Sequence, residues 1–249
     1  MKIRITLLLS FTFYFSTFSQ SGIPSKVGLF IDTLHQKKVL GFTVTNDSLN
    51  TLSFKTISKS DFDNYRKNYK AEIKMDENRI IPGDTAFRLK TQKPSSSFRN
   101  NKKNAIVSNT YLGFIDKLSL FAIDHVDGYN ATQELQLIDQ RSGKTYGFAS
   151  AFDNGLRAPL LSPDGKFLLA YSNNVFNDNE CFISILRVNT KNTDYLLEDY
   201  LGLLVNKWEI QEIVWINGNS IALFVKEEDL KDKSNTAGKH YFLKAKLAG

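Results

Sequence analysis

The sequence is poor in residues that hold a fold together covalently or through a metal: its 249 residues include one cysteine, Cys181, and three histidines. A single cysteine excludes an intrachain disulfide and a cysteine-cluster metal site. Cys181 begins a predicted strand, so we expect a small buried apolar residue there. With 42% hydrophobic and 23% charged residues, the composition excludes a disordered tail, a collagen-like rod, a disulfide-rich miniprotein and a multi-span membrane protein.

The first 19 residues have the features of a secretory signal. Lys2 and Arg4 precede an apolar run from Ile5 to Phe15, and the small residues Thr17 and Ser19 follow in the pattern that a signal peptidase accepts. A membrane anchor is the alternative, but the run is shorter than the about 20 mostly apolar residues that a span needs. We therefore expect cleavage after Ser19 and no transmembrane segment in the mature chain.

The compartment follows from the same region. No cysteine comes after the apolar run, which excludes a lipoprotein, and an exported chain without a disulfide is typical of a bacterial envelope. We expect a periplasmic or extracellular protein, for which nucleic acid is not an expected partner.

Positive charge is concentrated in one part of the chain. The formal net charge is +6, yet residues 55–103 alone hold 13 basic and 6 acidic groups, whereas residues 104–249 hold 14 basic and 18 acidic groups. The basic segment is either a solvated face or a surface that meets an anionic part of the envelope.

Residues 20–104 are predicted to form an N-terminal β segment with one helix and a basic loop. β-Branched and aromatic residues over 27–58 predict strands. Ser60 and Asp63 have the spacing of a capping box, and apolar residues then recur at helical spacing, which predicts a short amphipathic helix near 61–75.

Residues 105–249 contain three segments that can be laid over one another, each with a strand, a tight turn, a second strand and a third strand. The turns fall at residues 116–117, 163–165 and 217–218, and this spacing is typical of propeller blades and other repeats. One stretch does not fit: after Asp194, leucines recur at helical spacing, so residues 194–204 are predicted to be helical where an outer strand would be expected.

Two motifs carry a resemblance. Asp139 is followed by a Gly143-Lys144 turn, and residues 162–166 read Ser-Pro-Asp-Gly-Lys; this resembles the repeat of TolB-type and WD-like β-propellers. The chain is also similar to uncharacterised exported proteins of Bacteroidetes-type bacteria. The resemblance covers about residues 105–247 and implies a fold only, because its motifs are turn chemistry.

The expected fold class combines these observations. Three units are fewer than the about four to eight blades of a closed ring. We therefore predict a mostly β protein with a partial or irregular β-propeller-like arrangement of antiparallel sheets.

No motif identifies an active site. The histidines have no metal-ligand spacing, and the nucleophile-elbow, phosphate-loop, zinc-protease and dinucleotide patterns are absent. We therefore expect no catalytic residue, no metal and no cofactor. Polar and aromatic residues in the loops after paired strands are the remaining candidates for a ligand site, namely Asp124, Asp127, Asp153, Asp178, Glu180, Tyr129 and Phe176.

The leading hypothesis is a non-catalytic binding or scaffolding module of the cell envelope, with an envelope protein or a glycan as its partner. A carboxylate-dependent glycan hydrolase is the first alternative, because it needs only two of these acids about 5 to 10 Å apart. A protein that binds an anionic surface through residues 55–103 is the second.

Overall fold

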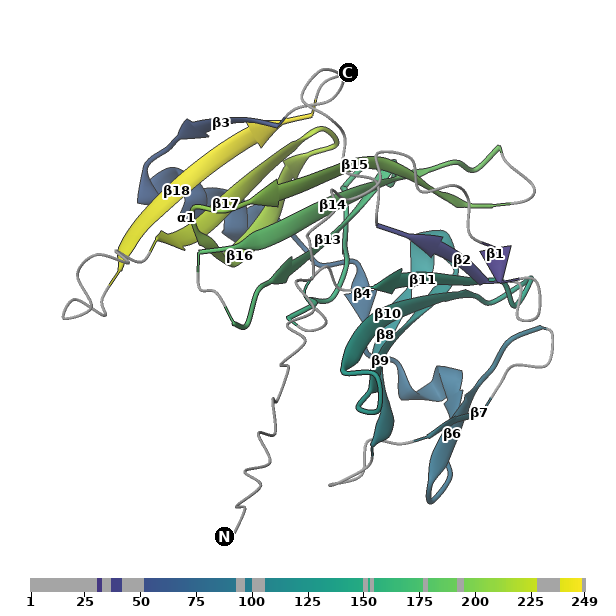
Figure 1. Cartoon of the computed structure of the whole chain (residues 1–249). Coiled ribbons are helices and arrows are strands. Elements are labelled where there is room, and N and C mark those ends of the chain that lie inside the picture. Colours follow the sequence, from purple (N-terminus) through teal and green to yellow (C-terminus); the bar gives the residue numbers. More distant parts are fainter. Residues whose placement is uncertain are drawn as a thin grey trace, which may run out of the picture.

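A computed structural model of the chain describes residues 31–32, 37–41, 52–92, 97–99, 106–149, 152, 155–176, 179–191, 195–227 and 238–247. The described residues are mostly β, with several sheets and one α-helix among them (Figure 1). None of the described helices is long and apolar enough to cross a membrane. The predicted fold class is therefore confirmed, whereas the predicted signal sequence lies outside the described residues.

The first sheet has seven strands, in the order β1 (Ile31–Asp32), β2 (Lys37–Leu40), β11 (Thr145–Ala149), β10 (Thr132–Asp139), β9 (Leu120–Asp127), β8 (Val107–Ile115) and β4 (Ile73–Lys74). Its centre is the antiparallel meander β8-β9-β10-β11. Strands from nearer the N-terminus extend both edges, since β2 lies parallel to β11 and β4 pairs with β8.

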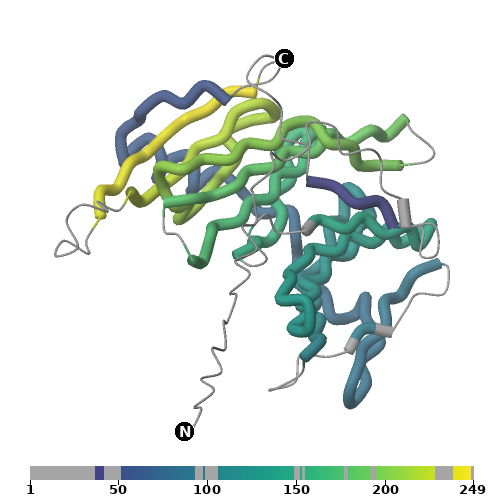
Figure 2. Tube along the Cα trace, viewed as in Figure 1, coloured from purple at the N-terminus to yellow at the C-terminus, as the bar shows by residue number. Residues whose placement is uncertain are grey.

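The second and third sheets each have four strands. The second is a meander of consecutive strands, whereas the third takes its last strand from nearer the N-terminus, so that the blue segment lies beside the yellow one in Figure 2. In sheet order, the second contains β12 (Leu160–Leu161), β13 (Phe167–Asn173), β14 (Cys181–Val188) and β15 (Leu197–Val205), and the third contains β16 (Glu209–Asn217), β17 (Ser220–Glu227), β18 (Lys239–Lys246) and β3 (Ser53–Thr56).

A smaller sheet lies beside the first. It contains β5 (Ile80–Ile81), β6 (Ala86–Leu89) and β7 (Ser97–Arg99), and a short 3₁₀ helix, η1 (Glu77–Arg79), precedes it. The Arg79 guanidinium lies 3.8 Å from the centre of the Phe114 ring in β8 and donates to Asp116 at 2.8 Å, which joins the two sheets.

The second sheet is packed between the first and the third. On one face, Leu168 belongs to an apolar cluster that includes Leu120 of the first sheet. On the other, Ile183 shares a cluster with Trp215 of the third sheet, and the fully buried Cys181 belongs to the same cluster, as expected. The described part of the chain is therefore an irregular, mostly β fold of several packed sheets.

The helix is present but begins and ends earlier than predicted. α1 spans Lys59–Asn68, and the capping box is formed by Ser58 and Asp61: the Asp61 N–H donates to Ser58 Oγ at 3.1 Å and the Ser58 N–H donates to Asp61 Oδ2 at 3.3 Å. The predicted box at Ser60 and Asp63 and the boundary at residue 75 are therefore wrong. The helix ends at Asn68, and Ile73 and Lys74 pair with β8 as strand β4.

The predicted helix over residues 194–204 is also wrong, because residues 197–205 form β15. The buried Leu197 and Leu201 are four residues apart, which is a helical spacing, yet they face the first-sheet cluster and the third-sheet cluster respectively. The pairing shifts register where Ile185 faces Leu201 and Leu186 faces Asp199, so one extra residue is inserted in β15. This bulge turns the strand over and sends the two leucines to opposite faces.

Candidate functional site

Three tight turns, one from each large sheet, lie together at one end of the molecule. The first contains the 3₁₀ helix η2 (Asp116–Leu118), and the Lys117 ammonium donates to the carbonyl oxygen of Pro163 in the second turn at 3.2 Å. Gly218 of the third turn lies so close to the Asp164 carboxylate that a β-carbon there would collide with it. The three turns predicted from sequence are therefore neighbours in space.

The second turn is held by its own side chains. Ser162 Oγ donates to Asp164 Oδ1 at 2.7 Å, and the Phe167 N–H donates to Ser162 Oγ at 3.0 Å. Burial alone would raise the pKa of Asp164, but the hydrogen bonds from Ser162 and the Lys166 N–H outweigh it and lower that pKa. Gly165 adopts φ +73°, the left-handed conformation that glycine tolerates best.

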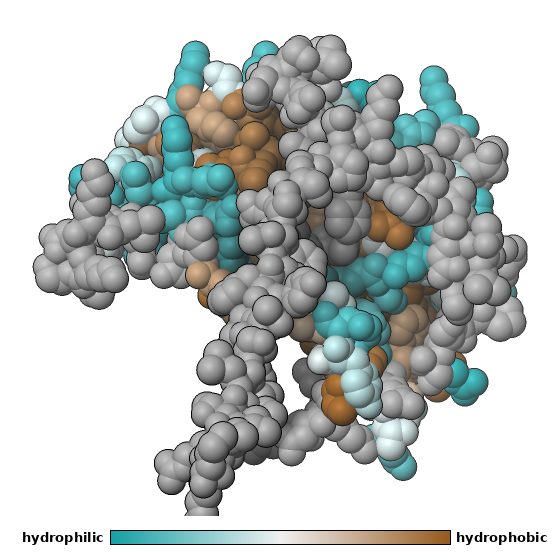
Figure 3. Space-filling model, in the orientation of Figure 1, coloured by the Kyte–Doolittle hydropathy of each residue, from teal (hydrophilic) through white to brown (hydrophobic). Residues whose placement is uncertain are grey.

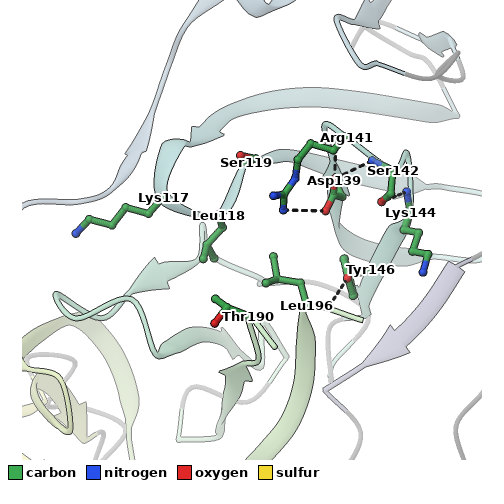
Figure 4. Close-up of a pocket in the computed structure, with 10 residues that line it drawn as sticks. All are labelled: Lys117, Leu118, Ser119, Asp139, Arg141, Ser142, Lys144, Tyr146, Thr190 and Leu196. Atoms are coloured by element: carbon green, nitrogen blue, oxygen red, sulfur yellow. Dashed lines mark hydrogen bonds and ion pairs between the residues drawn. The ribbon is translucent and has the colours of Figure 1, made fainter. Parts of the chain in front are cut away.

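A pocket of about 420 Å³ opens beside these turns, at the junction of the first and second sheets (Figure 4). The first sheet contributes η2 and the β10–β11 turn, and the second sheet contributes the loop between β14 and β15. The residues that line it are Lys117, Leu118, Ser119, Asp139, Arg141, Ser142, Lys144, Tyr146, Thr190 and Leu196.

The carboxylate of the pocket is engaged within its own turn. Asp139, which is mostly buried, accepts hydrogen bonds from the Arg141 N–H at 2.7 Å and from the Ser142 N–H at 2.9 Å. The turn reverses at Gly143, with φ +71°. Asp139 therefore fixes the turn from which Arg141, Ser142 and Lys144 are presented.

Two of the residues that line the pocket, Tyr146 and Leu118, are buried. Tyr146 is 2% exposed, and its hydroxyl oxygen accepts the Leu196 N–H at 2.7 Å, which links the two sheets. Burial raises the pKa of Tyr146, so the hydroxyl stays protonated at neutral pH. Leu118, also buried, belongs to the cluster that the two sheets share.

A buried lysine of the first sheet also bonds to the second sheet. The ammonium of Lys38 in β2 donates to the Leu197 carbonyl oxygen at 2.8 Å and lies 4.8 Å from the centre of the Tyr195 ring. Burial lowers the pKa of Lys38, against the opposing effect of the nearby carboxylates Glu198 and Asp199.

Three of the four charged side chains that line the pocket are basic. Lys117 donates to Glu72 Oε1 at 2.7 Å, and Figure 4 shows its side chain pointing away from the other pocket residues. The Lys144 ammonium lies 5.1 Å from the centre of the Tyr195 ring. Arg141 is 61% exposed on its side chain, and its guanidinium lies 3.6 Å from Asp139 Oδ2.

A second pocket, of about 440 Å³, lies on the other side of Lys117. It is bounded by α1, the segment after it, the turn of the second sheet at Pro163 and strand β16 of the third sheet. The polar groups of two aromatic residues in its wall already bond to the protein: Tyr69 donates to the Leu161 carbonyl oxygen, and the indole N–H of Trp215 donates to the Leu160 carbonyl oxygen.

The acids predicted from sequence take part in local hydrogen bonds. Asp124 accepts from Gln133 Nε2 at 2.9 Å, and Glu180 accepts from Asn174 Nδ2 at 2.6 Å. Asp127 accepts from Asn130 Nδ2 and from the Tyr129 N–H, and these bonds lower its pKa. Asp124 and Asp127 lie on β9, whereas Glu180 precedes β14 in another sheet.

The aromatic candidates stand on the surface, with Tyr129 75% and Phe176 86% exposed. Asp153 and Asp178 lie outside the described residues. None of the five candidates that the structure describes lines either pocket. Among the described residues, no group of three or more histidine, cysteine, aspartate or glutamate side chains is placed to hold a metal ion.

The basic segment carries ion pairs along much of its described length. Lys59 pairs with Asp63, Arg66 with Glu212 and Lys74 with Asp116. Figure 3 shows mixed surface character on one side of the molecule, with a hydrophobic area over the third sheet. The proposal that this segment binds an anionic surface stays a prediction.

Comparison of the chain with protein families, curated proteins and solved structures gave no match. The case for function therefore rests on the geometry of the site.

Proposed function

We propose that the protein is a non-catalytic binding module of the bacterial cell envelope and that its ligand occupies the pocket between the first and second sheets. One observation carries this proposal: polar side chains from two turns and one loop face a pocket whose floor is a buried core. Rigid frames that present a few polar groups are typical of ligand sites.

The charge and the connections of the pocket support the proposal. Its carboxylate is used to hold a turn, so the exposed Arg141 and Thr190 and the half-buried Ser142 provide polar surface for a ligand. The hydrogen bond between Tyr146 and Leu196 and that between Lys38 and Leu197 hold the two walls at a fixed separation. A site with fixed walls loses little conformational entropy when a ligand binds.

The binding part of the proposal can be tested by filling the pocket. Thr190 is exposed at its rim, so Thr190→Trp should close it without disturbing the core. Thr132→Trp, at an exposed position on β10 that does not line the pocket, is the matched control. A library of small polar compounds and glycan fragments is then screened by thermal shift.

The expected result is a set of compounds that raise the melting temperature of the wild type and of Thr132→Trp but not of Thr190→Trp. Compounds that act equally on all three proteins, or a library with no active compound, would contradict the proposal.

The envelope location has its own test. When the whole chain is expressed in a bacterial host, the protein recovered from the envelope fraction should begin at Gln20, as determined by mass spectrometry of the intact protein. Recovery of the uncut chain from the cytoplasm would overturn that part of the proposal.

A further inference from the structure

We infer that the pocket between the first and second sheets binds an oxyanion, that is, a ligand with a phosphate or carboxylate group, and that Lys117 exchanges Glu72 for that ligand. This inference deepens the proposed function and rests on it. It starts from the balance of charge: three cations, Lys117, Arg141 and Lys144, line the pocket with a single carboxylate, Asp139.

The carboxylate is not available to repel an anion strongly. Its Oδ1 accepts the backbone N–H groups of Arg141 and Ser142 at 2.7 and 2.9 Å, and these donors partly compensate its charge. A carboxylate with such donors remains a structural element of the turn, while the pocket as a whole keeps an excess of positive charge.

The ion pairs of Lys117 and Arg141 are weak enough for a ligand to replace them. The Lys117–Glu72 ion pair is partly open to solvent, with side-chain exposures of 45% and 23%. Arg141 reaches Asp139 only at 3.6 Å, beyond a good hydrogen-bond distance. Ion pairs at the surface contribute little to stability, whereas a desolvated oxyanion with several charged donors is held more strongly.

Neutral donors complete the site. Ser119, Ser142 and Thr190 have hydroxyl groups in the lining. Ser142 Oγ accepts the Lys144 N–H at 3.2 Å, which leaves its own hydrogen to donate. A group with several acceptor oxygens and no donor matches such a wall, and phosphate and carboxylate are the common groups of that kind.

Lys117 is the residue that lies between the two pockets. It lines both pockets, and its ammonium now faces Glu72 and Pro163, away from Arg141. The four-carbon stem of a lysine allows the ammonium to turn toward an anion in the first pocket. Removing the charge of Glu72 should therefore favour the anion.

The test is titration calorimetry with inorganic phosphate and with citrate, which separate a phosphate site from a carboxylate site, and with glucose as a neutral probe. Arg141→Gln should weaken binding of the preferred anion about tenfold, because it removes a charged donor. Arg66→Gln, which removes an arginine that pairs with Glu212 outside the pocket, should leave it unchanged.

Glu72→Gln should strengthen binding about two- to fivefold, the range expected for an exposed ion pair. Asp63→Asn is its control, since it also removes one negative charge but lies on α1 in a pair with Lys59. Equal strengthening by Glu72→Gln and Asp63→Asn, or weaker binding in Glu72→Gln with its fold intact by circular dichroism, would overturn the exchange of partners.

Failure of this inference can be told from failure of the proposed function. If neutral compounds bind in a manner abolished by Thr190→Trp while phosphate and citrate do not bind, the pocket is a ligand site but the oxyanion class is wrong. If no compound of either kind depends on Thr190, both fail.

Discussion

Asn173 connects the second sheet to the third, and its replacement by alanine should destabilise the protein. Asn173 ends β13 and is 5% exposed. Its Nδ2 donates to the carbonyl oxygen of Ile210 in β16 at 2.8 Å, and its Oδ1 accepts the Ile210 N–H at 3.0 Å. One side chain therefore satisfies both backbone polar groups of a residue in a neighbouring sheet.

Asn173→Ala lowers the free energy of unfolding because it leaves buried backbone groups without partners. Asn173→Ala removes both hydrogen bonds and leaves the two Ile210 groups without these partners, and an unsatisfied buried group costs about 1 to 3 kcal/mol. Glu209, half-buried beside them, lets some water approach. We therefore expect a loss of about 2 to 4 kcal/mol, which is a large part of the total stability of an ordinary domain.

Urea unfolding followed by tryptophan fluorescence measures this loss directly. Both tryptophans of the chain, Trp208 and Trp215, are buried in the core that the second and third sheets share. Asn68→Ala is the control, because Asn68 is exposed and bonds within α1, and a change of at most about 0.5 kcal/mol is expected for it. A loss below about 1 kcal/mol for Asn173→Ala, or one equal to that of the control, would refute the reasoning.

Three further predictions concern the turns and the core. Gly165→Ala should lower the free energy of unfolding by about 1 kcal/mol, because the space around Gly165 is open and only the left-handed backbone is strained. Gly218→Ala should lower it more, because its β-carbon meets the Asp164 carboxylate, and the reverse order in urea unfolding would count against the turn contacts. The lowered pKa of Asp164 contributes stability that is complete above about pH 4 and is lost as the pH falls through that lowered pKa, so Asp164→Asn should flatten this part of the profile of stability against pH. Burial raises the pKa of the Cys181 thiol, so a thiol reagent at pH 8 should label it in urea but not in the native protein, and rapid native labelling would contradict its place in the core.

Turns could be predicted from sequence because their interactions are local. The hydrogen bonds that Ser162 and Asp164 make in the turn lie within six consecutive residues, so the sequence motif contains most of what holds the turn. The same holds for Asp139 and the turn after it. That local chemistry was enough to place the three turns and to indicate the fold class.

Elements set by distant contacts were predicted poorly. The spacing of Leu197 and Leu201 is helical on its own, and only pairing with β14 and a bulge convert it into a strand. Ile73 continues the apolar period of α1, yet it is taken up by the edge of β8. In both cases, tertiary pairing outweighs local periodicity.

The pocket was missed for a related reason. Its lining comes from η2, from the β10–β11 turn and from the loop after β14, which are far apart along the chain. The candidates predicted from sequence are acids and aromatic residues, whereas the charged lining of the pocket is mostly basic, with Lys117, Arg141 and Lys144. The one signal available was the Gly143-Lys144 turn, which indicated a structural role and not a site.

The N-terminal strands explain how this pocket is kept in place. β2 pairs with β11, the strand that follows the pocket turn, and Lys38 of β2 also reaches across to Leu197 of β15. β3 covers the edge of β18 in the third sheet, and β4 covers the edge of β8 in the first. Each of these N-terminal strands pairs with a strand that lies later in the sequence. The edges of the first and third sheets are therefore covered only after the N-terminal part has docked. The geometry of the pocket thus depends on β2, whose residues lie outside its lining.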